Sequence, residues 1–330
     1  MKSLQRWIPL TGFTILTLMV ITLLVATVIT GLKSQITGGL LSIIVLVGAI
    51  IAIFIEGKRL ITDKNIIDDI PIKTHILDFI AVFVGGVLTC LLSQDIGLGA
   101  VVAASLVAIA AHMVFPILGV PAYCGAFVGM TSNALLFTRG EVALASAVAG
   151  MVYVLTSRVF TGFGGKLGTI ALIGVAATGI SLRRQFLFAP MFDNYATALI
   201  ILVAVIATPL TFYLSCPKKN GPVLASGAVG LAAGLLLPVL SPELGSTLAV
   251  VAICASFGGM TSQERCSNMW IMLITGVFTG IVFVFSTPLL GGAGGKLGTI
   301  AFGSILATYG YIRLYRSFAG ERSPSTNQCA

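Results

Sequence analysis

The sequence predicts an all-α polytopic membrane protein with about 12 membrane segments. Only 9% of its 330 residues are charged and 57% are hydrophobic, whereas soluble domains carry roughly 25% charged residues. Several windows of about 18 to 22 residues carry few or no charges, which is long enough to cross a hydrocarbon core of ~30 Å. These windows are apolar all round, unlike the alternating strands of a β-barrel. Composition and length therefore indicate a bundle of membrane helices.

A repeated glycine pattern is the further observation on which the predicted organisation depends. The letters Gly-Gly-Lys-Leu-Gly-Thr-Ile-Ala occur at 164–171 and again at 294–301. Each copy follows a stretch that begins with Cys and ends with Gly-Met-Thr-Ser, at 124–132 and 254–262. Equivalent positions keep one constant spacing throughout, and they match Lys, Thr, Ser and Cys, which apolar composition alone would not align. We interpret the pattern as an internal duplication, a tandem repeat that follows two separate N-terminal helices.

Composition also argues against several classes of function. The net charge of +8 and the pI near 9.3 are explained by basic residues at the cytoplasmic rims of membrane spans. Because no run of five or more Lys or Arg occurs, we expect no nucleic-acid partner. The six cysteines contain no C-x-x-C, and the only histidines are His75 and His112. Ligands for zinc, haem or an iron–sulfur cluster are thus scarce, and we expect neither a cofactor, a metal site nor a structural disulfide.

Two membrane helices are expected within residues 1–56. Lys2 and Arg6 precede an apolar stretch at about 11–31, and a second stretch runs from about 38 to 55. A signal peptide is the alternative for the first stretch, but its apolar region would be shorter, and no convincing small-x-small cleavage site follows. We therefore interpret both stretches as membrane helices.

Residues 57–75 form the only sustained polar segment. Lys and Arg alternate there with Asp, and four isoleucines between 61 and 70 make the segment partly amphipathic. It either lies along the membrane surface or forms a solvated loop. Its basic content places it in the cytoplasm together with both termini, including the tail at 317–330. We expect an integral protein of a bacterial cytoplasmic (inner) membrane.

Five apolar segments are predicted in each copy of the repeat, at 76–184 and 194–316. They lie at 76–93, 98–118, 121–137, 141–158 and 165–183, and at 198–215, 220–240, 245–262, 268–287 and 295–313. If the third segment crosses the membrane, the two copies are inverted, and if it dips in and returns, they are parallel. The matched basic ends Arg183 and Arg313 favour parallel copies. We nevertheless expect inverted repeats with broken or re-entrant helices, because inverted repeats are frequent in transporters.

The third segment of each copy contains the first set of candidate binding residues. Its Gly-Met-Thr-Ser sequence is a point where a helix can end, and backbone groups freed at membrane depth need partners from protein, water or a solute. Close packing of small residues between helices is the alternative explanation. The candidates are Gly129, Thr131 and Ser132 in the first copy and Gly259, Thr261 and Ser262 in the second.

The fifth segment of each copy contains the second set. It opens with Gly-Gly-Lys, and the first amides of a helix carry a partial positive charge to which the lysine adds a full one, which suits a small anion. A lysine that extends to the lipid headgroups is the alternative. The spacing matches neither a Walker A loop nor G-x-G-x-x-G. The candidates are Gly165, Lys166 and Thr169, with Gly295, Lys296 and Thr299 in the second copy.

Two ionisable residues within the predicted spans are candidates for proton coupling, because a charge in a span is costly. They are Asp78 and His112, and neither has an ionisable counterpart in the second copy. Each also has an ordinary explanation, an interfacial position for Asp78 and neutral packing for His112. Glu264 and Arg265 follow the second Thr-Ser, and we expect them to be an exposed pair at a segment end.

Transport is the function that this pattern favours. We expect a uniporter, a channel-like protein or a proton-coupled transporter that moves a small polar or anionic solute between the two repeats. One alternative is a membrane-embedded enzyme acting on a lipid-like substrate, for which the spans offer few acid–base residues. Another is a non-transporting subunit of a membrane complex, in which the N-terminal helices would supply docking or homo-oligomer contacts. Apart from the solute, the expected partner is the lipid bilayer.

Overall fold

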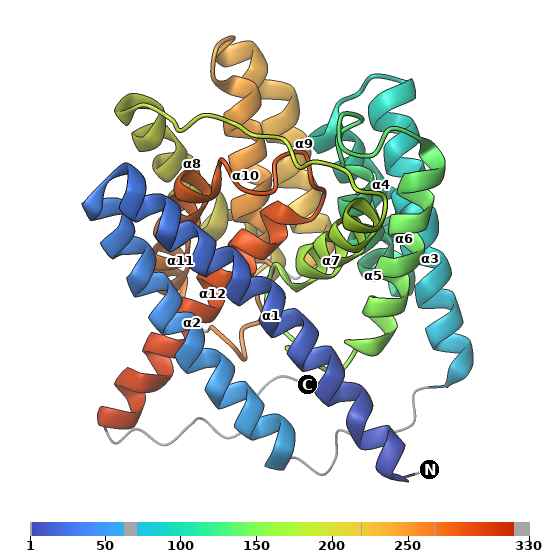
Figure 1. The fold of residues 1–330 in the computed structure, drawn as a ribbon, viewed down its shortest axis with the longest axis horizontal. Helices are drawn as coiled ribbons and strands as arrows, with labels where there is room; N and C mark the ends of the chain where they lie inside the picture. The colour runs from blue at the N-terminus through green and yellow to red at the C-terminus, as the bar shows by residue number, and fades with distance from the viewer. Residues whose placement is uncertain (1, 63–70, 219, 267, 320–330) are drawn as a thin grey trace.

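The computed structural model describes residues 2–62, 71–218, 220–266 and 268–319, and this part of the chain is all-helical (Figure 1). The twelve α-helices are α1 (Lys2–Ser34), α2 (Ile36–Thr62), α3 (Ile72–Cys90), α4 (Ala100–Val114), α5 (Gly119–Gly129), α6 (Arg139–Leu155), α7 (Lys166–Ser181), α8 (Asn194–Ser215), α9 (Pro222–Leu240), α10 (Gly245–Gly259), α11 (Met269–Ser286) and α12 (Lys296–Phe318). A π-helical turn follows α3 at Leu91–Asp95, and a 3₁₀ turn at Pro116–Leu118 precedes α5.

Six helices in the described part of the chain are long and apolar enough to cross a membrane, namely α1, α2, α3, α8, α9 and α11. Four further apolar helices, α4, α5, α7 and α10, are shorter. The prediction of an all-α chain is therefore confirmed, and these helices indicate an integral membrane protein. The described residues do not form about 12 full-length spans, because several of the expected segments are helical over only part of their length.

The ends of two expected elements differ from the sequence analysis. Helix α2 does not stop near residue 55 but continues to Thr62, so the polar segment begins as helix. Residues 63–70, which contain most of the isoleucine pattern, lie outside the described residues. Helix α12 continues to Phe318, and residues 320–330 of the expected tail also lie outside them.

The third segments are broken helices. Helix α5 ends at Gly129 and α10 at Gly259. Residues 130–138 and 260–266 are not helical, and Thr138 and Asn268 are the N-caps of α6 and α11. At 1.5 Å per residue, the 11 residues of α5 span roughly 16 Å, about half of a hydrocarbon core. Backbone at these breaks must find hydrogen-bond partners within the protein.

Helices α7 and α12 begin close together at the centre of the molecule. Gly165 and Gly295 precede them with φ of 78° and 87°, a left-handed conformation that glycine adopts without strain. A Cβ atom on Gly168 would meet Gly298 Cα, and a Cβ on Gly298 would meet Gly168 Cα. The two helices therefore cross in direct backbone contact near their first turns.

Helices α1 and α2 define two sides of the molecule. They form an antiparallel hairpin whose helices meet where Gly31 lies against Gly39. We call this the hairpin side, and we call the opposite side, where α1 begins and α12 ends, the termini side. In Figure 1 the termini side is the lower edge of the view.

We call residues 76–184 and 194–316 the two halves of the chain. Helix α6 of the first half and helix α11 of the second end on opposite sides of the molecule. Leu155, at the end of α6, lies against Gly12, which is roughly 33 Å from the hairpin turn. Phe285, at the end of α11, lies against Gly38 beside that turn. Helix α7 leads to the segment along the hairpin side, whereas α12 descends to the termini side (Figure 1).

Candidate functional site

Each broken segment is hydrogen-bonded to the glycine-rich loop of the other half, the loop before α12 for Thr131 and the loop before α7 for Thr261. Thr131 Oγ1 accepts a bond from Gly294 N at 3.2 Å and donates to Val128 O at 2.6 Å. Thr261 Oγ1 does the same in the other half, accepting from Gly164 N at 3.0 Å and donating to Gly258 O. Each hydroxyl therefore uses its only proton within its own helix end and satisfies an amide of the opposite half. Both threonines are therefore placed to hold a helix break of one half against the glycine-rich loop of the other half.

The serines that follow make a second pair of contacts between the halves. Ser132 N donates to Gly292 O, and Ser262 N donates to Gly162 O, both at 2.9 Å. Their side chains differ in surroundings. Ser132 Oγ accepts from Ala134 N at 3.2 Å, whereas Ser262 Oγ is buried without a hydrogen-bond partner among the described residues.

The lysines of the Gly-Gly-Lys motif turn back toward the preceding helix. Lys166 Nζ donates to Thr156 O at 2.6 Å, and Lys296 Nζ donates to Thr287 O at 3.2 Å. Thr156 and Thr287 are the C-caps of α6 and α11, where helix carbonyls carry partial negative charge and favour a cation. An ammonium has three donors, so each lysine has capacity for further acceptors.

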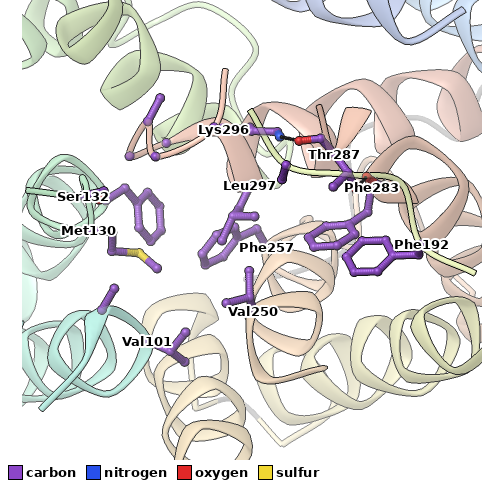
Figure 2. A pocket seen from close by; sticks show the side chains of 18 residues that line it. Val101, Met130, Ser132, Phe192, Val250, Phe257, Phe283, Thr287, Lys296 and Leu297 are labelled. Carbon is purple, nitrogen blue, oxygen red and sulfur yellow. Dashed lines mark hydrogen bonds between the residues drawn. The ribbon is translucent and has the colours of Figure 1, made fainter. Parts of the chain in front are cut away.

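A cavity of about 280 Å³ lies where the halves meet, on the side of Lys296 (Figure 2). One wall is polar and contains Lys296, Thr287 and the glycine-rich loop 291–295, and Ser132 lies at its edge. The other walls are apolar side chains from both halves. They include Val101, Phe127, Met130, Phe192, Val250, Phe257 and Phe283.

Phe127 and Phe257 line the cavity and are in contact with each other. Their ring centroids lie 4.4 Å apart, and both side chains are almost fully buried. They occupy equivalent positions of the two sequence copies and come from the two short helices α5 and α10. The two halves therefore contact each other through these two rings at the wall of the cavity.

The structure places only part of the predicted site around this cavity. Ser132, Gly295 and Lys296 line it. Gly129 and Gly259 instead serve packing, since a Cβ on Gly129 would meet Gly86 O and a Cβ on Gly259 would meet Thr208 O.

Two further threonines of the predicted site are buried inside helices. Thr299 Oγ1 bonds Gly295 O at 3.3 Å. Thr169 Oγ1 is buried without a partner among the described residues. Lys166 and Ser262 do not line the cavity. Lys166 lies toward the termini side, since its partner Thr156 lies beside Gly12, and Ser262 lies beside Gly162 in the loop before α7.

The two proton-coupling candidates lie apart from the cavity. His112, near the end of α4, lies against Gly119 and Gly221, and its Nδ1 is buried without a partner among the described residues. Asp78 is half-buried in the second turn of α3. Neither lines the cavity, and their role in proton coupling stays a prediction.

The sequence analysis missed a buried ion pair. Arg265 Nη1 and Nη2 contact the two carboxylate oxygens of Glu56 at 2.6 and 3.0 Å, and the two residues are 9% and 6% exposed. The expectation that Arg265 is exposed is therefore wrong, although Glu264 is exposed. One signal was available, because Arg265 stands where the first half has Leu135. Its partner could not be found from sequence, because Glu56 is 209 residues away.

Within the described residues, no group of three or more His, Cys, Asp or Glu side chains is arranged to hold a metal ion. Comparison of the chain with protein-family models, curated proteins and solved structures finds no match. The function therefore has to be argued from the geometry of the crossing and its cavity.

Proposed function

We propose that this chain is a membrane transport protein that moves a small anionic solute along the interface between its two halves. One observation carries the proposal, namely a cavity lined from both halves, at the crossing of two broken segments, with Lys296 in its wall. Non-helical backbone at membrane depth is tolerated where it is buried in protein or lines a cavity. Transporters use such sites, in which discontinuous helices meet between repeats, to bind their solutes.

The lining of the cavity narrows the class of solute. Lys296 gives one bond to Thr287 O and retains donors for a carboxylate or a similar group. Rings and aliphatic side chains cover the remaining walls, so the rest of the solute is apolar. At ~30 Å³ per water molecule, 280 Å³ corresponds to roughly nine waters. A monocarboxylate with a short chain or a single ring fits this description.

Inverted repeats are part of the proposal. Supporting observations are the opposite directions of α7 and α12 and the paired bonds of Thr131 and Thr261, which are equivalent positions of the two copies. Basic residues gather on the termini side, which favours a cytoplasmic location for that side. Lys58 and Arg59 near the end of α2 are examples. With this orientation the cavity faces away from the cytoplasm.

The two alternative functions have less support. An enzyme would need acid–base or nucleophilic groups facing a common space, and among the described residues that line the cavity there is no His, Asp or Glu. A docking role for the N-terminal helices competes with their use inside this chain, where α2 packs along α12. We therefore favour transport.

Flux into proteoliposomes tests the transport proposal. The panel contains benzoate and butyrate as anions, with benzamide and butyramide as neutral analogues of the same size. We expect benzoate and butyrate to enter proteoliposomes faster than they enter protein-free liposomes. We expect the protein to accelerate the entry of the two amides less. Rates equal to those of protein-free liposomes for the whole panel would overturn the proposal.

Binding to the purified protein tests the role of Lys296, and the chain supplies its own control. We expect Lys296→Met to weaken benzoate binding at least tenfold, because the cation in the cavity wall is lost. Lys166→Met removes the equivalent lysine, which does not line this cavity. We expect the affinity of this variant for benzoate to change less than about twofold. Equal loss in both variants would contradict the assignment of the solute to this cavity.

A further inference from the structure

We infer that the Glu56–Arg265 ion pair, together with the ring of Phe163, is a gate that closes the transport pathway on the termini side. The inference rests on the proposed function for the existence of a pathway. It adds the side chains that close the pathway and assigns a role to α2, which lies outside both halves.

The guanidinium of Arg265 is held on every side. Besides the two carboxylate contacts to Glu56, its Nε donates to Thr161 O at 3.0 Å. Its plane lies over the ring of Phe163, with the guanidinium carbon 4.4 Å from the ring centroid. Tyr309 of α12 completes the enclosure, since its hydroxyl lies 3.5 Å from Arg265 Nη1 and 3.4 Å from Glu56 Oε1. Arg265 therefore ties α2, α12 and the loop before α7 together.

The equivalent positions on the hairpin side carry smaller, uncharged side chains, and one of them lines the cavity. Ala293, which lines the cavity, stands at the position of the second copy that corresponds to Phe163. Leu135 stands at the position of the first copy that corresponds to Arg265. The same backbone crossing thus has a small residue, Ala293, on the hairpin side, where the cavity lies. It has an aromatic ring and a guanidinium on the termini side. This asymmetry is expected of a pathway that is open at one end only.

Helix α1 reinforces the closure. Phe13 stacks on Phe160 with centroids 4.9 Å apart and an interplanar angle of 15°. Gly57 of α2 lies beside Phe13, since a Cβ there would be 3.2 Å from its ring. The N-terminal hairpin therefore covers the loop between α6 and α7, which holds Gly162 and Phe163. Moving α2 away would uncover that loop.

The charges around Glu56 allow its ion pair with Arg265 to break and form again. Two buried charges stabilise each other only while they are paired, because each is costly to leave alone in a dry environment. Arg59 lies one helical turn from Glu56, with Nη1 3.8 Å from Glu56 Oε2, and its side chain is 53% exposed. Glu56 therefore keeps a cationic partner at the membrane surface when Arg265 leaves it.

Cysteine accessibility tests the gate without any solute. In a cysteine-free background, Ser262→Cys reports on the closed side, and Ser132→Cys reports on the equivalent position beside the cavity. A charged thiol reagent is applied to the purified protein in detergent, and the labelling rates are compared with and without Glu56→Gln. We expect Glu56→Gln to raise the labelling rate at position 262 at least tenfold while the rate at position 132 does not rise. Asp95→Asn, which breaks the exposed pair with Arg139, is the control and should leave both rates unchanged.

The outcomes separate a gate from a structural contact. An unchanged rate at position 262 would overturn the inference, and so would a parallel rise at both positions, which indicates general loosening. If Glu56→Gln does not give a monodisperse protein, Arg265→Lys is read by the same criteria, because it keeps the charge but loses the two-pronged contact. If Glu56→Gln raises the labelling rate at position 262 as expected but the protein carries no anion flux, the proposed solute class is refuted and the inference of a gate stands.

Discussion

At the scale of single residues, the polar side chains of the crossing divide into those committed to hydrogen bonds within the protein and those that line the cavity. Thr131 and Thr261 have their hydroxyl protons committed to carbonyls and receive amides from the opposite half. Lys296 faces the cavity and retains donors. The sequence predicts a binding role for the threonines and the lysines alike, because hydrogen-bond partners 97 and 163 residues away cannot be deduced from spacing.

The structural role of Thr131 predicts a loss of stability. Thr131→Val keeps the shape but leaves the buried Gly294 amide without its acceptor, and an unsatisfied buried donor costs about 1–3 kcal/mol. Thr131→Ser should retain most of the wild-type stability. Thr14→Val, at an exposed hydroxyl that bonds within its own helix, is the control and should change stability by less than about 0.5 kcal/mol. The measurement is the free energy of unfolding in mixed micelles, and equal values for Thr131→Val and Thr14→Val would contradict the role.

At the scale of elements, short broken helices replace several full spans. Helices α5 and α10 end at glycines that press against the backbones of α3 and α8, and α7 and α12 start at left-handed glycines. The existence of each helix could be predicted from apolar windows. The sequence also predicts a possible helix end at Gly-Met-Thr-Ser, and α5 and α10 do end there. It could not predict which chain segments accept the freed backbone groups.

The glycine before α12 provides a test of this element. Gly295→Ala requires a left-handed backbone for an alanine, which costs about 1–2 kcal/mol, and it pushes a Cβ into Gly168 O and Leu172 N. We expect a total loss of roughly 2–5 kcal/mol. Gly97→Ala is a matched control, since Gly97 has φ of 79° with nothing within 4 Å of its Cβ position. If both variants lose the same stability, close backbone contact at the crossing is not important.

At the scale of the whole molecule, α6 and α11 end on opposite sides, and the hairpin of α1 and α2 covers one side. Phe127 and Phe257 line the cavity, whereas the Glu56–Arg265 pair lies near the end of α2 on the termini side. The distribution of Lys and Arg along the sequence did not decide between inverted and parallel repeats. The contacts of α6 and α11 with opposite ends of the hairpin favour inversion.

Side-specific labelling tests the inversion. Asn133 and Gln263 are exposed and occupy equivalent positions, one after each broken helix. In a cysteine-free background, we expect Asn133→Cys in intact cells to react with an impermeant thiol reagent. Gln263→Cys should react only after the membrane is permeabilised, because it lies on the termini side. Labelling of both from the same side would show that the two copies are parallel.

The sequence by itself determined that this is a helical membrane protein, where its helices lie and which polar groups recur at one constant spacing. These features follow from apolar windows and from scarce residue types, both of which are local properties of the chain. Only the tertiary structure decided that Thr131 and Thr261 bond the backbone of the opposite half and that Glu56 is the partner of Arg265. It also decided that a cavity lies beside Lys296, whereas Phe163 and Arg265 occupy the equivalent positions on the other side. The physical reason is that burial, hydrogen-bond satisfaction and charge pairing depend on neighbours distant in the sequence, and folding alone brings those neighbours together.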